Sequence, residues 1–361
     1  MRKRGDPPVS VASKASNVLL AKCRAKFGRR LTHSDIEALC SCRSVQETAA
    51  YLKANTRYCT VLETVDPNAM NRLSLENAVR RMMYDEFSAL CRYELSVGDW
   101  FSDYILMNGE IRQIMSYLWL LSAGHPEDFI LSLPGFFLQH ADFDIARLAS
   151  CRNYGEFLAV MRPSRFGRIL RTFTPLDGEP LDCAVIEHAL YNLMYKTIFD
   201  IIEKHYSGSA REELLDILNA QLELRNFSSI YRMKKYYAAD NDSIRAMLLG
   251  SPDSHESRLL RRLISAGSSD EALRIFLERS RLGRKMGNVS ECAGVEFAAH
   301  EIMLSKAAHM LRFSIHPSSV LLSYIIFAET EVQDIITISE AVHYGMPPEE
   351  IMKIIAIDSL K

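Results

Sequence analysis

Glycine and proline are scarce in this chain, with 16 and 12 residues among 361. Both fractions lie below the roughly 7% and 5% of average proteins. Because these residues interrupt regular structure, their scarcity predicts long uninterrupted elements. Alternating apolar and polar stretches between Asn-Gly or Asp-Gly turns are nearly absent, so we expect helices rather than strands.

The chain also lacks the features of several functional classes. Its net charge is only −2, so no nucleic-acid partner is expected. The longest apolar runs have about ten residues, half of the roughly 20 that a membrane-spanning helix needs. No apolar segment follows the basic N-terminus, so we expect no secretory signal and a cytoplasmic location.

Eight cysteines are present, yet no two are spaced as Cys-x-x-Cys. The closest pair, Cys40 and Cys42, is separated by one residue, which is a poor spacing for zinc. Scattered thiols without a secretory signal are expected to be reduced and to serve as small core residues. The cysteines therefore predict no metal site.

Catalytic motifs are missing too. The sequence contains no phosphate-binding P-loop, no His-Glu-x-x-His motif and no Gly-x-Ser-x-Gly elbow. Glu296 and His300 would share a helix face that could hold a metal, but without a second acid–histidine pair a hydrogen bond or ion pair explains them more simply. The adjacent Glu187 and His188 would diverge on a helix. We predict no catalytic residue, no cofactor and no metal.

What is present is internal repetition. The first landmark is a helix start with Ser or Asn at the cap and Glu three residues later. This Glu can reach back to the N–H of the cap residue or interact with the positive end of the helix dipole. A leucine stands five residues before each cap. The starts are Ser44-Val45-Gln46-Glu47, Asn153-Tyr154-Gly155-Glu156 and Ser268-Ser269-Asp270-Glu271, and the leucines are Leu39, Leu148 and Leu263.

Two further landmarks follow each helix start in the same order. The second reads Leu75-Glu76-Asn77-Ala78, Ile186-Glu187-His188-Ala189 and Val295-Glu296-Phe297-Ala298. The third reads Glu110-Ile111-Arg112-Gln113-Ile114, Glu223-Leu224-Arg225-Asn226-Phe227 and Glu331-Val332-Gln333-Asp334-Ile335. Ordered landmarks that recur about every 110 residues predict three diverged copies of one helical unit.

The predicted fold class is all-α, with helical repeats at residues 15–134, 135–249 and 250–361. The boundaries fall near Pro134 and Gly250, and residues 1–14 are expected to form a disordered basic extension. One unit is small and is expected to complete its core by packing against its siblings. Three units could close around a pseudo-threefold axis or extend as a solenoid, and the periodicity does not choose between them.

Several segments resemble a known family. They are the opening helix Asn17–Lys26, the middle segment Glu223–Phe227 followed by Ile230–Lys235, and the ending Tyr344–Ile351. Together with the layout in three copies, they resemble the C subunit of prokaryotic V/A-type ATPases, the counterpart of the d subunit in the eukaryotic proton pump. The resemblance covers roughly residues 15–355.

This resemblance implies a funnel of three helical domains. Such a protein caps the membrane-embedded rotor ring at the cytoplasmic face and receives the foot of the central stalk. The implied partners are the rotor ring subunits and the central stalk subunits. The implied role is a non-catalytic adaptor that transmits torque coupled to proton or sodium transport.

Seven residues are candidates for partner contacts. The repeated glutamates Glu110, Glu223 and Glu331 could line a central cavity and meet a basic stalk, or they could serve as helix-start or ion-pair residues. Tyr231, Arg232, Lys234 and Lys235 could contact acidic or carbonyl groups of a partner, or they could form a solvated charged face.

Two other function classes remain open. The chain could be a free-standing helical-repeat scaffold, which an extended concave solenoid would favour, or an all-helical enzyme that retains a metal or cofactor. In addition, most charged side chains are basic in residues 257–288 and acidic in residues 329–361. These two segments could pair with each other or face a partner.

Overall fold

The computed structural model describes residues 9–63, 65–97, 102–132, 141–175, 180–250, 257–287 and 292–357. All regular elements in these ranges are helical, which confirms the predicted class. The first helix begins at Val9, inside the extension that was expected to be disordered at residues 1–14. No glycine or proline interrupts the stretch from Val9 to Phe27, which explains this early start. Residues 1–8 and the expected boundary at Pro134 lie outside the described residues.

The helices follow one another in a recurring order of short and long elements. The first group is α1 (Val9–Gly28), α2 (His33–Cys40), α3 (Val45–Asn55), α4 (Cys59–Leu62), α5 (Arg72–Val97) and α6 (Ser102–Ala123). The second is α8 (Ile145–Leu148), α9 (Tyr154–Met161), α10 (Gly167–Leu170), α11 (Cys183–His205), α12 (Gly208–Tyr236) and α13 (Asn241–Ala246). The third is α15 (Arg258–Ser265), α16 (Ser269–Arg279), the 3-10 turn η4 (Gly283–Lys285), α17 (Cys292–Phe313), α18 (Pro317–His343) and α19 (Pro348–Met352). Further 3-10 turns are η1 (Pro67–Ala69), η2 (Pro126–Ser132) and η3 (Arg171–Phe173).

The predicted helix starts share one local geometry. The side chains of the caps Ser44, Asn153 and Ser268 accept hydrogen bonds from the N–H groups of Glu47, Glu156 and Glu271. Each glutamate carboxylate also accepts a backbone hydrogen bond, but the donor is not the N–H of the cap residue, as was expected. The donor is the preceding N–H, of Arg43, Arg152 and Gly267, at 2.6, 2.8 and 2.7 Å respectively. Because the cap residue is extended, with φ between −156° and −147°, the chain before it runs alongside the first turn.

Gly283 fixes a close approach of two backbones after the third of these helices. A Cβ atom at this position would lie 2.1 Å from the carbonyl oxygen of Phe276. We expect Gly283→Ala to lower the free energy of unfolding by about 2–3 kcal/mol, because the backbone must move to admit the methyl group. Urea unfolding measures this loss. Gly28→Ala is the control, since no atom lies within 4 Å of its Cβ position, and an equal loss there would refute the steric reason.

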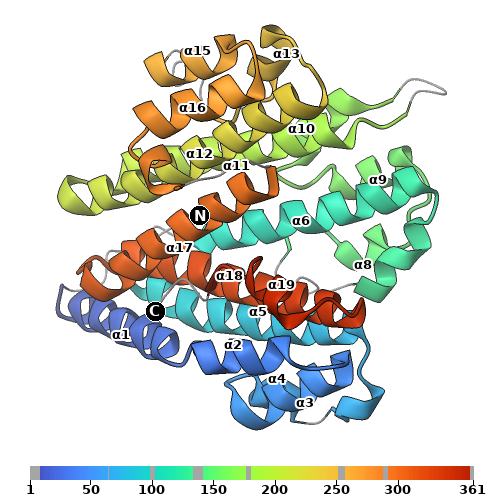
Figure 1. Ribbon diagram of the computed structural model, residues 1–361, viewed down its shortest axis with the longest axis vertical. Helices are drawn as coiled ribbons and strands as arrows, with labels where there is room; N and C mark the ends of the chain where they lie inside the picture. Colours follow the sequence, from blue (N-terminus) through green and yellow to red (C-terminus); the bar gives the residue numbers. More distant parts are fainter. Residues whose placement is uncertain are drawn as a thin grey trace.

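The long helices close into a ring. In the described part of the chain, the six longest helices are α5, α6, α11, α12, α17 and α18. Along the chain, α6 packs on α11 and α12 packs on α17, and α18 returns to pack on α5. The short helices α2 to α4 lie at one end of the molecule and α15 and α16 at the other (Figure 1). The first and last groups are therefore in direct contact, unlike the ends of an extended solenoid.

Candidate functional site

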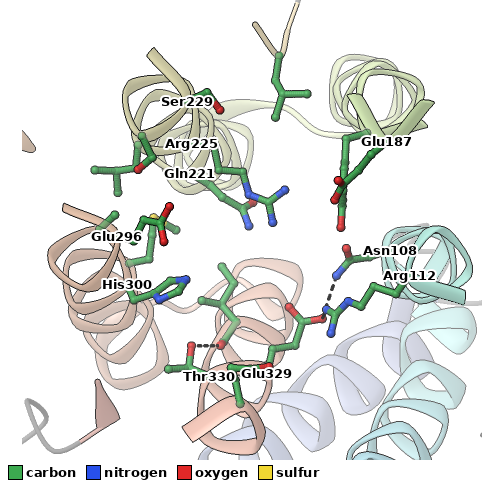
Figure 2. A pocket seen from close by; sticks show the side chains of 18 of the residues that line it. Asn108, Arg112, Glu187, Gln221, Arg225, Ser229, Glu296, His300, Glu329 and Thr330 are labelled. Carbon is green, nitrogen blue, oxygen red and sulfur yellow. Dashed lines mark hydrogen bonds and ion pairs between the residues drawn. The ribbon is translucent and has the colours of Figure 1, made fainter. Parts of the chain in front are cut away.

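A cavity of about 690 Å³ lies between these six helices, and each helix contributes to its wall (Figure 2). In all three groups, residues at the same sequence offset from a landmark line this cavity. The residues four positions after the glutamate of the second landmark are Arg80, Tyr191 and His300. The residues two positions before the glutamate of the third landmark are Asn108, Gln221 and Glu329. The residues two positions after it are Arg112, Arg225 and Gln333. The wall therefore contains several polar and charged side chains, together with apolar ones such as Leu224 and Met303.

Glu110, Glu223 and Glu331 themselves are not among the residues that line this cavity. Because successive residues of an α-helix are about 100° apart, positions two before and two after a residue lie on the opposite side of the helix. The residues two positions before and after each glutamate therefore face the cavity, and the glutamates point away from it. The expectation that these glutamates line the cavity is not met, and the sequence analysis did not single out Arg112 and Arg225. Their common offset of two residues from a repeated glutamate was the available signal.

Each repeated glutamate contacts the next group of short helices. Glu110 on α6 accepts the Asp142 N–H at 2.6 Å, just before α8. Glu223 on α12 accepts the Ser280 hydroxyl, just after α16. Glu331 on α18 closes the series, because it accepts the Leu31 N–H at 3.0 Å near the start of the chain. The arginines within 4.0 Å of Glu110 and Glu331 fit the ion-pair alternative for those two residues, whereas Glu223 contacts a hydroxyl. Contact of the three glutamates with a partner stays a prediction.

Glu110 is 1% exposed and one of its carboxylate oxygens has no hydrogen-bond partner. Burial raises the pKa of Glu110 to about 7, and the Asp142 N–H and the Arg165 charge offset this only in part. The nearest Arg165 nitrogen is 3.9 Å from the carboxylate. The folded protein therefore favours the neutral acid near pH 5 and carries a mostly ionised, poorly neutralised carboxylate near pH 8.

We expect the stability difference between Glu110→Gln and the wild type to change with pH. The pKa of Glu110 is higher in the folded than in the unfolded state, so protonated Glu110 stabilises the folded state. This contribution is fully present below a pH of about 4.5 and is lost as the pH rises through about 7. Glutamine keeps the acceptor for Asp142 and does not ionise. Its stability relative to wild type should rise by about 2–3 kcal/mol between pH 5 and pH 8. Urea unfolding at both pH values measures it, and a constant difference would contradict the burial of an ionisable Glu110.

The other four candidates have different surroundings. Tyr231 is 0% exposed, and its hydroxyl accepts a hydrogen bond from Lys235 at 3.2 Å. Lys234 donates to the carbonyl oxygens of Ile264 and Ala266, at the end of α15, both at 2.7 Å. Arg232 alone among the four lines the cavity, where it lies 3.6 Å from the carboxylate of Glu296.

Ion pairs and histidines shape the electrostatics of the cavity. Arg112 from α6 pairs with Glu329 from α18, which also accepts the Asn108 amide at 2.9 Å (Figure 2). Burial and then the charge of Arg225 lower the pKa of His300, although it is open to the cavity. His188 contacts the Leu248 carbonyl oxygen at 2.9 Å.

Two weaker expectations can be compared with these contacts. The partner of Glu296 is Arg232, which fits the ion-pair interpretation of that residue. Within the described ranges, no three His, Cys, Asp or Glu side chains lie together as a metal site requires. None of the ion pairs of Arg232, Lys306 and Lys353 joins residues 257–288 to residues 329–357, so the pairing of the basic and acidic segments stays a prediction. The arginines of α15, at one end of the molecule, are exposed.

None of the helices in the described part combines the length and the apolar character that crossing a membrane requires.

Comparisons with known proteins identify one family over most of the chain. The model of the family described as ATP synthase (C/AC39) subunit matches residues 19–354. The C subunit of the A-type ATP synthase of Pyrococcus horikoshii is 22% identical over 93% of this chain and 88% of its own length. The protein of the same name from Pyrococcus abyssi is 21% identical over the same shares. That of Archaeoglobus fulgidus is 28% identical, over 47% of this chain and 48% of its own length.

Proposed function

Because the chain belongs to the ATP synthase (C/AC39) subunit family, we propose that it is the adaptor that caps the membrane rotor ring of a V/A-type ATPase and holds the central stalk. In this role it transmits torque between the central stalk and the rotor ring, which couples rotation to the transport of protons or sodium ions. It has no catalytic site of its own and works at the cytoplasmic face, bound to the ring and stalk subunits. Residues 15–134, 135–249 and 250–361 act as three copies around a pseudo-threefold axis.

The observation that carries the proposal is the closed ring of long helices around a polar cavity. A part that transmits torque must resist deformation, and a ring closed by the contact of α18 with α5 has no free end that could bend. The polar wall suits an occupant that is a protein segment, since such interfaces combine hydrogen bonds with packing. An extended concave surface, which would favour a free-standing scaffold, is not formed by these helices.

Exposed apolar side chains at the ends of the long helices also support large interfaces. Contiguous patches of exposed apolar side chains mark binding surfaces, and several exposed apolar residues of this chain are near neighbours in sequence. They lie in the last turns of long helices or directly after them. Examples are Trp119 in α6, Tyr236 and Tyr237 at the end of α12, Phe313 at the end of α17 with Ile315 after it, and Tyr344 and Met346 after α18.

Co-purification and coupling test the proposal. A detergent extract captured through this chain should contain ATPase subunits, and membranes without the chain should lose ATP-driven ion transport while nucleotide hydrolysis by the detached catalytic part persists. Recovery of an assembled enzyme that pumps ions normally without this chain would refute the adaptor role.

A further inference from the structure

Arg225 is the exception among the arginines of the cavity. Four arginines line its wall, and three have a carboxylate within 4.0 Å. Arg80 lies 2.9 Å from Glu76, Arg112 pairs with Glu329, and Arg232 lies 3.6 Å from Glu296. Within the described residues Arg225 forms no ion pair. Its guanidinium lies over the ring of Tyr191, 5.0 Å from the centroid, and points into the cavity (Figure 2).

The order of residues around the ring explains why Arg225 lacks an internal partner. Arg112 and Arg225 occupy the same offset from their landmark glutamates, and Arg112 reaches Glu329 of the preceding group around the ring. The residue that corresponds to Glu329 for Arg225 is Asn108, an amide. Asn108 itself donates to Glu329. The chain therefore places a neutral side chain where a carboxylate would neutralise Arg225.

An unpaired guanidinium in a cavity is a strong anion site. Arginine stays protonated at all physiological pH values, and its planar fork matches a carboxylate with two parallel hydrogen bonds. Surrounding protein weakens the solvation of the charge, so an incoming anion gains more there than at an open surface. Glu187 also faces the cavity, from the helix that carries Tyr191, but forms no ion pair with Arg225.

We propose that the protein segment held in the cavity presents a carboxylate, from an Asp or Glu side chain or a chain terminus, to Arg225. This inference rests on the proposed function, in which the cavity receives a segment of the central stalk. Arg225 then both anchors the segment and fixes its rotational position, because the other three arginines of the wall are already neutralised. In the free chain Arg225 has no ion-pair partner among the described residues, and the complex supplies one.

Arg225→Gln tests the proposal in two measurements. Complexes stripped of the chain are titrated with fluorescently labelled chain, and Arg225→Gln should bind at least about 30-fold more weakly, with a smaller dependence on salt. Arg225→Lys should recover part of the affinity. The melting temperature of the free Arg225→Gln chain should be unchanged or higher, which a residue with a purely structural role would not show. Arg81→Gln, at a side chain that is 72% exposed on α5, is the matched control.

The outcomes separate this inference from the proposed function. If Arg225→Gln binds within twofold of wild type while Ser229→Trp, which places an indole in the cavity, binds much more weakly, the carboxylate proposal fails and the adaptor role stands. If both variants bind normally, the cavity does not receive the stalk segment, and both the carboxylate contact and the placement of the stalk in the cavity are wrong. If Glu187→Gln weakens binding as much as Arg225→Gln does, an internal pair of Arg225 with Glu187 replaces the proposed contact.

Discussion

Glu331→Ala should lower the free energy of unfolding by about 3–5 kcal/mol, the loss expected when one member of a buried ion pair is removed. Glu331 is 0% exposed, and its Oε1 accepts hydrogen bonds from Arg57 Nη2 at 2.5 Å and Tyr58 Oη at 2.9 Å. The Arg57 side chain is only 8% exposed. Without Glu331 its positive charge would remain in the interior with incomplete compensation.

The loss should reach beyond one contact because Arg57 belongs to a network that closes the ring. Its Nη1 contacts Glu86 of α5 at 3.2 Å and Tyr324 of α18 at 3.0 Å. Glu86 also accepts Lys26 of α1 at 2.8 Å. Three helices distant in sequence thus share one set of charges at the point where α18 returns to α5.

Urea unfolding of three variants measures this effect. Glu331→Ala and Arg57→Ala should each be strongly destabilised, and the double variant should lose less than the sum, because no lone charge is left in the interior. Asp85→Ala removes a partner of Arg81 at 3.7 Å on the surface, with side chains 58% and 72% exposed. It should cost less than about 0.5 kcal/mol. A loss below about 1 kcal/mol in Glu331→Ala would contradict the role of the network in closing the ring.

The helix starts could be predicted from sequence because their contacts are local. Ser44 and Glu47 satisfy N–H groups within four positions of each other, so a short pattern contains all the partners. Leu39, Leu148 and Leu263, five residues before the caps, are 0% exposed in all three groups. One detail of the helix starts was predicted wrongly. The glutamate accepts a hydrogen bond from the N–H of the residue before the cap, not from that of the cap itself.

The partners of the repeated glutamates could not be predicted in this way. Glu331 binds Arg57, which is 274 residues away, and no periodic pattern in either segment indicates the other. The constant spacing showed that the glutamates were equivalent, but it did not show which side of each helix faces the cavity. That information comes from the contacts of α6 with α11, α12 with α17 and α18 with α5, which only the folded chain reveals.

Ser229→Trp should reduce binding of the stalk segment by about 10- to 100-fold, because an indole would clash with the occupant of the cavity. Ser229 on α12 lines the cavity and is only partly buried, so the larger side chain has room in the free chain. The cavity of about 690 Å³ admits one indole without displacing the helices. The substitution is therefore expected to weaken partner binding while leaving the free chain folded.

Binding of labelled chain to stripped complexes measures the loss, and circular dichroism with a melting curve verifies that the free variant is folded. Ser305→Trp is the matched control, because Ser305 is an exposed serine on α17 that is not among the residues lining the cavity. It adds the same indole outside the ring and should bind like wild type. If both tryptophan variants bound equally well, the cavity would not be the site that holds the stalk, and the exposed apolar side chains at the helix ends would be the surfaces to test next.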